Sequence, residues 1–236
     1  MSGILALYMK TFCIGDIHGA YKALMQCLER SGFSYSHDRL IVLGDVCDGY
    51  AQVNLCIDEL LKIKHCYYIV GNHDLWAVDW ALNHQKPSVW LEQGGVGTIA
   101  SYGEGPMPAA HVDFLRQGRF WLEMDNKLFV HGGFNPQLPI HEQDKEKFVW
   151  DRELIVSAYR KSTVDADYKF STYEDIFLGH TPTRNFHSSL PQHFCNVWAL
   201  DTGCGWGGAL TIMDIHSKHF WQSDVTAKLY EGIRGR

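Results

Sequence analysis

The sequence predicts an α/β fold in which two β-sheets pack against each other with helices on the outside. In the first third of the chain, short apolar segments alternate with amphipathic helical patterns, and further short strands follow in the remainder. A β-α-β-α-β order implies right-handed crossovers and a parallel sheet. The later strands read as antiparallel, so we expect them to form a second sheet that packs on the first.

The first third supplies three strands and three helices. Leu24, Cys27 and Leu28 recur on one side of a helical pattern, as the period of an α-helix requires. A second helical pattern begins at Val53 and is apolar over a broad surface. The predicted strands are residues 10–14, 39–43 and 66–70, and the predicted helices are residues 20–31, 53–64 and 75–83.

The remainder of the chain has a different character. A glycine-rich stretch, residues 91–105, is expected to form a loop and a short helix near the functional site. Residues 120–123 and 127–130 flank the polar residues Asp125 and Asn126, which is typical of an antiparallel hairpin. A helix over residues 152–161 follows, and the last predicted strands are residues 176–178, 197–200, 209–213 and 219–222.

Length and composition indicate one large domain over residues 1–236, with residues 1–9 as a candidate N-terminal extension and Met9 as an alternative start. Of 236 residues, 46% are hydrophobic, which allows a sizeable core. The net charge of −6 argues against a basic nucleic-acid-binding face, but bound divalent cations could still attract a phosphorylated substrate. No apolar stretch approaches the roughly 18–20 residues of a membrane span, and no signal peptide is expected.

The cysteines indicate the redox environment. Seven occur, at irregular spacings and without a C-x-x-C pair, and most lie within apolar segments such as residues 11–14. An odd number of scattered cysteines favours buried free thiols in a reducing compartment over a disulfide framework. A cytoplasmic protein is therefore expected.

The most informative pattern is found where predicted strands end. Five strands are followed by polar residues able to bind a metal ion, usually after a glycine. In α/β folds, ligands bind beyond the carboxyl ends of the strands, and glycine there lets the backbone turn sharply. The pattern therefore predicts that one rim of the sheets presents seven side chains: Asp16, His18, Asp45, Asn72, His73, His131 and His180.

These side chains suit a pair of divalent cations. Carboxylates and imidazoles without thiolates favour Mn²⁺, Fe or Zn²⁺. One carboxylate can bridge two ions, and two ions about 3.5–4 Å apart can hold a hydroxide and clamp the oxygens of a phosphate. A single Gly-Asp pair or a single histidine at a strand end is usually structural. The agreement of five segments favours a metal site over that simpler interpretation.

Five sequence blocks also resemble a known family. Residues 15–19 (Gly-Asp-Ile-His-Gly), 44–49 (Gly-Asp-Val-Cys-Asp-Gly) and 71–74 (Gly-Asn-His-Asp) are similar to the signature blocks of calcineurin-like metallophosphoesterases. The likeness is greatest to the phosphoprotein-phosphatase branch in its short bacterial and bacteriophage form. Residues 131–133 and 179–182 resemble the two later histidine motifs. The resemblance implies an α/β/β/α sandwich, with two mixed sheets flanked by helices.

The resemblance also implies a role for each polar residue. Two divalent ions, with Mn²⁺ as the first choice, would share Asp45. A hydroxide bridging the ions would attack the phosphorus atom, and His73, oriented by Asp48, would protonate the leaving oxygen, an effect typically worth about 10²–10⁴-fold in rate. The implied ligands are Asp16 and His18 for the first ion, Asp45 as the bridge, and Asn72, His131 and His180 for the second ion.

The sequence departs from the family pattern at one position. Protein phosphatases of this branch have an arginine directly after the second-block aspartate, where this chain has Gly49. Loss of a guanidinium weakens recognition of a doubly charged phosphate. Arg152 resembles the family's later phosphate-binding arginine, and Arg184 is a weaker candidate that could simply be a solvated loop residue. Asp201 could be a partner of a metal-bound histidine or part of a turn.

These observations predict a metal-dependent phosphatase that hydrolyses a phosphate monoester, with phospho-Ser/Thr of proteins as a candidate substrate. A nucleotide or a small phosphorylated molecule is also compatible with the site. Diadenosine tetraphosphate hydrolysis and phosphodiester hydrolysis remain as alternatives, and Gly49 favours them because a diester carries less charge. A non-catalytic binding module on the same fold is a further alternative, but it would not need the complete set of polar residues.

Overall fold

The computed structural model describes residues 9–103 and 105–236 and contains two five-stranded sheets. The first sheet consists of β1 (Thr11–Ile14), β2 (Arg39–Val42), β3 (His65–Tyr68), β9 (Thr211–Asp214) and β10 (Phe220–Gln222). The second consists of β4 (Trp121–Met124), β5 (Lys127–Val130), β6 (Asp175–Leu178), β7 (Gln192–Phe194) and β8 (Val197–Ala199). The strand orders are β10-β9-β1-β2-β3 and β4-β5-β6-β8-β7.

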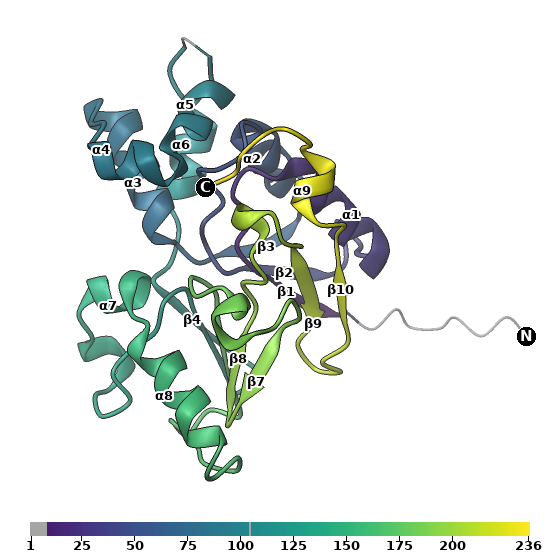
Figure 1. Ribbon diagram of the computed structural model, residues 1–236, viewed down its shortest axis with the longest axis vertical. Coiled ribbons are helices and arrows are strands. Elements are labelled where there is room, and N and C mark those ends of the chain that lie inside the picture. The colour runs from purple at the N-terminus through teal and green to yellow at the C-terminus, as the bar shows by residue number, and fades with distance from the viewer. Residues whose placement is uncertain (1–8, 104) are drawn as a thin grey trace, which may run out of the picture.

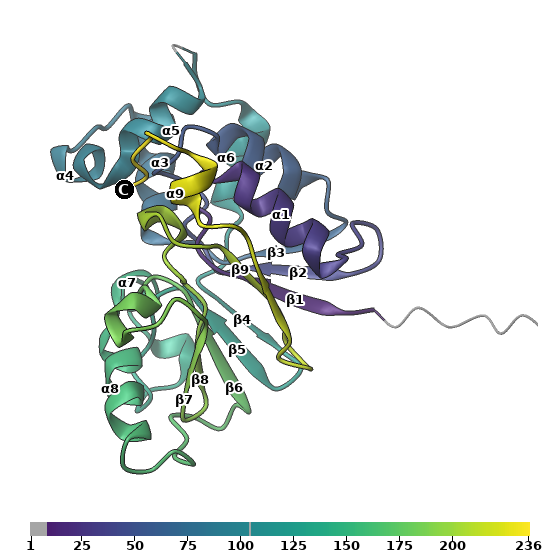
Figure 2. The ribbon, with the colours of Figure 1, turned by 45° about the vertical axis from the view of Figure 1, so that its right-hand side comes forward.

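Helices cover the outer face of each sheet. Figure 2 shows α1, α2 and α6 above the first sheet, and α7 and α8 beside the second. The predicted sandwich of two mixed sheets flanked by helices is therefore confirmed. The helices are α1 (Tyr21–Ser31), α2 (Val53–Leu61), α3 (Asn72–Asn83), α4 (Ser88–Trp90), α5 (Val96–Ser101), α6 (Ala109–Arg116), α7 (Lys145–Trp150), α8 (Glu153–Ser162) and α9 (Thr226–Leu229).

Strand directions differ from the prediction in the second half of the chain. The predicted hairpin of β4 and β5 is confirmed, but β5 pairs parallel with β6, and β6 pairs parallel with β8. A long connection that includes α7 and α8 joins β5 to β6, and such crossovers are what parallel pairing needs. The last two strands return to the first sheet, where β9 runs antiparallel to β1. The later strands are therefore not all antiparallel, as their pattern alone had indicated, and the second sheet is mixed.

The core between the sheets follows from the two-residue period of the strands. Cys13 of β1, Ile41 of β2 and Phe177 of β6 are fully buried in one cluster between the sheets. Phe12 and Ile14, the neighbours of Cys13, belong to the second cluster, which lies under the helices. Alternate residues thus face opposite sides of the sheet, and both sides are buried.

Helix α3 begins three residues earlier than predicted, at Asn72 instead of residue 75. The carboxylate of Asp74 accepts hydrogen bonds from the backbone N–H groups of Gly71 and Cys47, at 3.0 and 2.9 Å. This carboxylate satisfies a free N–H group at the helix start, as a capping residue does. Asn72 and His73 therefore lie in a rigid first turn of helix. The sequence did not reveal α4, α6, α7, α9 or β7, which are short.

Other expectations concern the N-terminal extension, the state of the cysteines and the absence of a membrane span. Apart from Met9, the candidate extension at residues 1–9 lies outside the described residues. All seven cysteines are within the described part of the chain, and each is a free thiol. None of the helices in that part is both long and apolar enough to cross a membrane. The interpretation of residues 1–236 as one domain and the cytoplasmic location remain predictions.

Candidate active site

The seven predicted polar residues converge where the carboxyl ends of the two sheets meet. Three strands of the first sheet and two of the second contribute to the cluster, and each of the seven side chains is at most 4% exposed. Asp16 and His18 follow β1, Asp45 follows β2, Asn72 and His73 follow β3, His131 follows β5, and His180 follows β6.

Within this cluster, two groups of ligand atoms could each hold a metal ion. One group is Asp16, His18 and Asp45, and the other is Asp45, His131 and His180. In each group the ligand atoms all lie within 4.8 Å of one another. Asn72 adjoins the second group, with Oδ1 at 3.1 Å from Nε2 of His131. Asp45 belongs to both groups, which is the position expected of a bridging carboxylate.

The chemistry of the cluster fits cations. Oδ2 of Asp45 is buried and has no hydrogen-bond partner among the described residues. A buried carboxylate oxygen without a partner is costly, and a metal ion would satisfy it. Burial, together with the nearby charges of Asp201 and Asp45, raises the pKa of Asp16 well above its usual value. Three carboxylates crowded together in this way favour the binding of positive charge.

Backbone carbonyls orient two of the imidazoles. Nδ1 of His18 donates to the carbonyl oxygen of Cys47 at 3.1 Å, and Nδ1 of His131 donates to that of Leu43 at 2.6 Å. In both rings Nε2 therefore faces the candidate metal positions, an arrangement typical of metal-binding histidines. Burial lowers the pKa of His18 well below its usual value and that of His180 to about 2, so both rings are neutral, as metal binding requires.

His131 differs from these two. Burial opposes its protonation, but the charge of Asp45 and a hydrogen bond to it raise the pKa of His131 to about 10. Nε2 of His131 lies 3.4 Å from Oδ1 of Asp45. Conversely, burial acts against ionisation of Asp45, but His131 and His73 hold its pKa well below the usual value. A metal ion that binds His131 must therefore replace the proton on Nε2.

The glycines of the strand-end pattern make room for neighbouring carboxylates. A Cβ atom on Gly71 would lie 2.1 Å from Oδ1 of Asp45, and one on Gly179 would lie 2.3 Å from Oδ1 of Asp16. At these two positions φ is not positive, so close approach explains the glycine better than the sharp turn that we expected. Gly44, with φ of 93°, does adopt the conformation of such a turn, and four functional residues are left-handed as well. His18, Asp45, Asp48 and His180 have φ between 47° and 72°, which costs about 1–3 kcal/mol each.

His73 is held by a buried carboxylate. Nδ1 of His73 lies 2.6 Å from Oδ2 of Asp48. The Asp48 carboxylate also accepts hydrogen bonds from Nε1 of Trp90, at 2.8 and 2.9 Å, and from Oγ1 of Thr98 at 2.6 Å. Burial raises the pKa of Asp48, although the bond to His73 opposes the shift. Nε2 of His73 is buried and has no partner within the described chain, and it lies 4.0 Å from Oδ2 of Asp45.

Trp90 and Thr98 were not singled out in the sequence. Trp90 is fully buried. Thr98 lies in α5, within the glycine-rich stretch that was expected to form a short helix near the site, and this expectation is confirmed. No local motif marks either residue, because their contacts with Asp48 span 42 and 50 residues.

The two arginines singled out in the sequence lie in different surroundings. Nε of Arg152 donates to Nε2 of His180 at 3.2 Å, so this exposed residue reaches the cluster. Arg184 is exposed, and its guanidinium lies 4.5 Å from the centre of the Trp206 ring. Another arginine, Arg236, was not predicted. Its Nη1 lies 3.1 Å from Nε2 of His18.

Asp201 forms a turn next to the cluster. Its Oδ1 accepts a hydrogen bond from the backbone N–H of Gly203 at 2.9 Å. Oδ2 is buried and unpartnered among the described residues, so no bond from this oxygen to a histidine supports the role of histidine partner. Burial raises the pKa of Asp201 to about 6. Its charge nevertheless acts on Asp16, and Asp201 thus adds to the negative character of the site.

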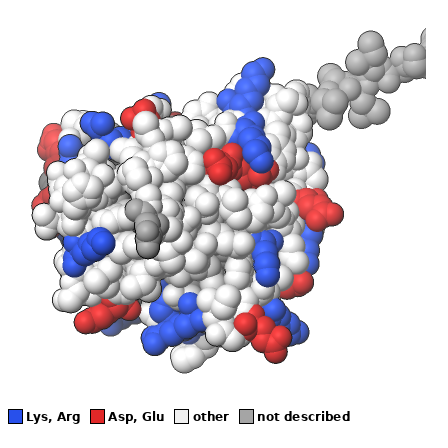
Figure 3. Space-filling view, turned by 90° about the horizontal axis from the view of Figure 1, so that it is seen from above, with Lys and Arg blue, Asp and Glu red and all other residues white. Residues whose placement is uncertain are grey.

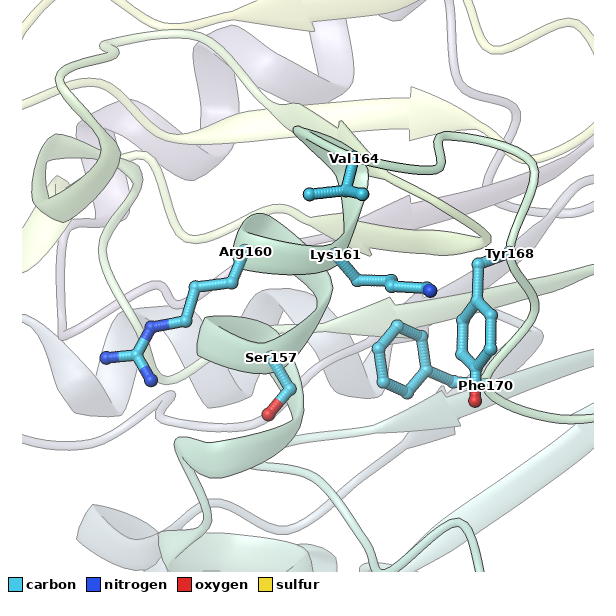
Figure 4. A pocket seen from close by; sticks show the side chains of 6 residues that line it. All are labelled: Ser157, Arg160, Lys161, Val164, Tyr168 and Phe170. Atoms are coloured by element: carbon cyan, nitrogen blue, oxygen red, sulfur yellow. The ribbon is translucent and has the colours of Figure 1, made fainter.

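One surface hollow lies away from this cluster. It has a volume of about 520 Å³ and is lined by three residues of α8 and three from the segment that follows it. Figure 4 shows these side chains. None of the seven clustered residues belongs to this hollow. On the face shown in Figure 3, basic and acidic side chains are interspersed, and no extended patch of one sign is visible there.

The fold and the cluster of acidic and imidazole side chains define a metallophosphoesterase. The chain belongs to the calcineurin-like phosphoesterase family, whose model matches residues 9–209. It is therefore a phosphoric ester hydrolase, and the interpretation as a non-catalytic module is set aside.

Two curated relatives illustrate the range of the family. The chain is 28% identical over 209 residues to serine/threonine-protein phosphatase 1 of Salmonella typhimurium, covering 86% of this chain and 90% of that protein. It is 26% identical over 271 residues to a symmetrical bis(5'-nucleosyl)-tetraphosphatase of Cellvibrio japonicus, covering 87% and 95%. The crystal structure of a proposed diadenosine tetraphosphatase has the same fold, with a TM-score of 0.69, 17% identity, and coverage of 92% and 94%.

Proposed function

We propose that the protein is a metal-dependent phosphatase that hydrolyses phosphate monoesters, with phosphoserine and phosphothreonine side chains as its main substrate class. The observation that carries this proposal is the placement of Nε2 of His73. This nitrogen is buried, unpartnered within the described residues, and 4.0 Å from Oδ2 of Asp45, the carboxylate that belongs to both candidate metal groups. A proton donor at this point faces the place where an ester oxygen would leave.

Two overlapping groups of residues would hold the cations. Asp16, His18 and Asp45 would hold one divalent cation, and Asp45, Asn72, His131 and His180 the other. Bound in this way, two cations supply Lewis-acid stabilisation and an activated water molecule. Mn²⁺ is the proposed metal, with Fe or Zn²⁺ as alternatives, because the donors are oxygen and imidazole nitrogen.

His73 would hold a proton on Nε2 for the leaving oxygen, and Asp48 would keep the other proton on Nδ1. The alkoxide of serine or threonine leaves poorly at neutral pH, so such a donor is useful for these substrates. Arg152, which reaches His180 from the exposed side, would bind a phosphate oxygen, since a guanidinium pairs well with a doubly charged phosphate.

The lengths of the alignments bear on the choice between a monoesterase and a tetraphosphatase. The alignment with the Salmonella phosphatase, at 209 residues, fits within this chain. The alignment with the tetraphosphatase, at 271 residues, is longer than the whole 236-residue chain, so that relative has segments without a counterpart here. The proposed diadenosine tetraphosphatase of known structure nevertheless matches this chain over almost its full length, with coverage of 92% and 94%, so alignment length does not exclude the tetraphosphatase activity.

A second candidate activity is hydrolysis of a dinucleoside polyphosphate. Trp206 is 41% exposed, and the guanidinium of Arg184 lies 4.5 Å from its ring. Such a ring could stack on a base while the arginine contacts a further phosphate. Several relatives are named as tetraphosphatases, which supports this alternative.

A comparison of substrates tests the proposal. The Mn²⁺-loaded protein would be assayed with p-nitrophenyl phosphate, bis-p-nitrophenyl phosphate, a phosphoserine peptide and diadenosine tetraphosphate. We expect kcat/KM to be highest for the two monoesters. A higher kcat/KM for diadenosine tetraphosphate than for the peptide would select the second candidate, and a preference for the diester would indicate a phosphodiesterase.

A further inference from the structure

Position 49, where related protein phosphatases have an arginine and this chain has glycine, is poorly suited to an arginine. Gly49 has φ of 79°, a conformation that side chains other than glycine rarely adopt. A Cβ atom there would lie only 3.0 Å from the carbonyl oxygen of His18. Tyr50 is not the obstacle, because its ring stacks on Tyr230 with the ring centres 4.2 Å apart. An arginine at position 49 would therefore be strained by the backbone itself.

The side chain of Arg236 approaches the same place from the other end of the sequence. In Figures 1 and 2 the segment after α9 runs back toward α3 and α4. The backbone N–H of Arg236 donates to the carbonyl oxygen of Gly205 at 2.8 Å. Cβ atoms on Gly49, Gly94 and Gly205 would lie 3.7, 3.3 and 3.0 Å from the Cγ or Cδ atom of Arg236. Three glycines thus form a slot that accepts the stem of this arginine.

Two of the three nitrogens of the Arg236 guanidinium have a polar neighbour, and the third has none among the described residues. Nη1 lies 3.1 Å from Nε2 of His18, and Nη2 donates to Oε1 of Gln93 at 3.3 Å. The centre of the Trp206 ring lies 5.0 Å away. Nε is buried and has no hydrogen-bond partner within residues 9–103 and 105–236. A buried charged donor without an acceptor is costly, and an anion that accepted a hydrogen bond from this nitrogen would remove that cost.

We propose that Arg236 binds the phosphate group of the substrate and so replaces the arginine that position 49 lacks. This inference rests on the proposed phosphatase function. Arg152 reaches the cluster at His180 and Arg236 reaches it at His18, so the two guanidiniums contact different candidate metal groups. A phosphate between them would be bound by a charged donor on each side.

A competing explanation is that Arg236 only obstructs the site. Nη1 lies 3.1 Å from Nε2 of His18, the atom through which this ring would bind a metal ion. If obstruction were its only role, removing the side chain would strengthen metal binding and leave phosphate binding unchanged. If Arg236 binds phosphate, removal would weaken phosphate binding, and the metal content would not fall, because the side chain is not a metal ligand.

The test compares Arg236→Ala and Arg236→Lys with the wild-type full chain. Arg160→Ala serves as the control. Arg160 is an exposed residue of α8 that lines the hollow in Figure 4, and its replacement removes the same charge. For each Mn²⁺-loaded variant, calorimetry would measure the affinity for inorganic phosphate, and elemental analysis would measure bound manganese. Assays with p-nitrophenyl phosphate and its bis ester would follow, with any affinity tag at the N-terminus.

We expect Arg236→Ala to weaken phosphate binding about tenfold to a hundredfold, the range for a charged hydrogen bond. Arg236→Lys should recover part of the loss, because it keeps the charge but not the fork of donors. In Arg236→Ala, kcat/KM should fall more for the monoester than for the diester, and the manganese content should stay as in the wild type. Arg160→Ala should match the wild type in phosphate affinity, manganese content and kcat/KM. Unchanged phosphate affinity in Arg236→Ala, or a loss of equal size in Arg160→Ala, would overturn the proposal. If the wild type binds phosphate through Arg236 but hydrolyses neither ester, the proposed function fails and the phosphate site remains.

Discussion

Replacing His73 with asparagine tests the proton donor. His73 is fully buried and is joined to Asp48 at 2.6 Å, and its Nε2 has no partner among the described residues. If this nitrogen protonates the leaving oxygen, His73→Asn should lower kcat for a phosphoserine peptide by about 10²–10⁴-fold. The loss corresponds to about 2.7–5.5 kcal/mol of transition-state stabilisation. p-Nitrophenol is a better leaving group and needs less protonation, so its ester should lose much less.

The structure also indicates how well His73→Asn should fold. Removing one partner of a buried ion pair typically costs about 3–5 kcal/mol. Here the Asp48 carboxylate would keep its hydrogen bonds from Trp90 and Thr98, so we expect a destabilisation below that range. His111→Asn is a matched control, because His111 is also buried and pairs with a carboxylate, that of Asp58, at 2.9 Å outside the site.

The assay measures kcat for both esters, bound metal and the thermal unfolding midpoint in the wild type and both variants. His73→Asn should retain its metal ions and show a loss that depends on the leaving group. His111→Asn should show a change in stability alone. Equal losses on the peptide and on p-nitrophenyl phosphate, with metals retained, would refute the role of His73 as general acid.

Three further predictions concern Asp45, Arg152 and Phe177. Asp45→Asn should abolish turnover and reduce the metal content measured by elemental analysis, because a neutral amide bridges two cations poorly; two retained ions with normal turnover would exclude the bridge. Arg152→Ala should lower kcat/KM at least about tenfold on monoesters and less on diesters; a neutral result on monoesters would assign the phosphate contact to other residues. Phe177→Ala should lower the free energy of unfolding by about 3–5 kcal/mol in urea titrations, since Phe177 is fully buried and stacks on Phe129 at 5.0 Å, whereas a loss below about 1 kcal/mol would contradict this view of the inter-sheet core.

The parts of the site that the sequence predicted are those with local signals. Asp16, Asp45 and Asn72 each follow a short apolar strand and a glycine, so the strand pattern alone placed them at one rim. Two sheets that meet at the carboxyl ends of their strands then bring His131 and His180 to the same cluster. The periodic helices α1 and α2 were visible for the same reason, since each carries one apolar face.

What the sequence did not predict depends on contacts between distant residues. Parallel pairing of β5 with β6 is set by the crossover through α7 and α8, which a strand pattern does not record. Trp90 and Thr98 bind Asp48 across more than forty residues. Arg236 reaches His18 across 218 residues. No motif surrounds it, and only the slot formed by glycines from three different segments shows where its side chain lies.

Metal reconstitution tests the central claim most directly. The protein would be stripped with a chelator and titrated with Mn²⁺ while bound ions and the hydrolysis of p-nitrophenyl phosphate are measured on the same samples. The shared position of Asp45 in two ligand groups predicts that activity rises as two ions bind per chain. Full turnover in the metal-free protein, or full turnover with a single bound ion, would contradict the account.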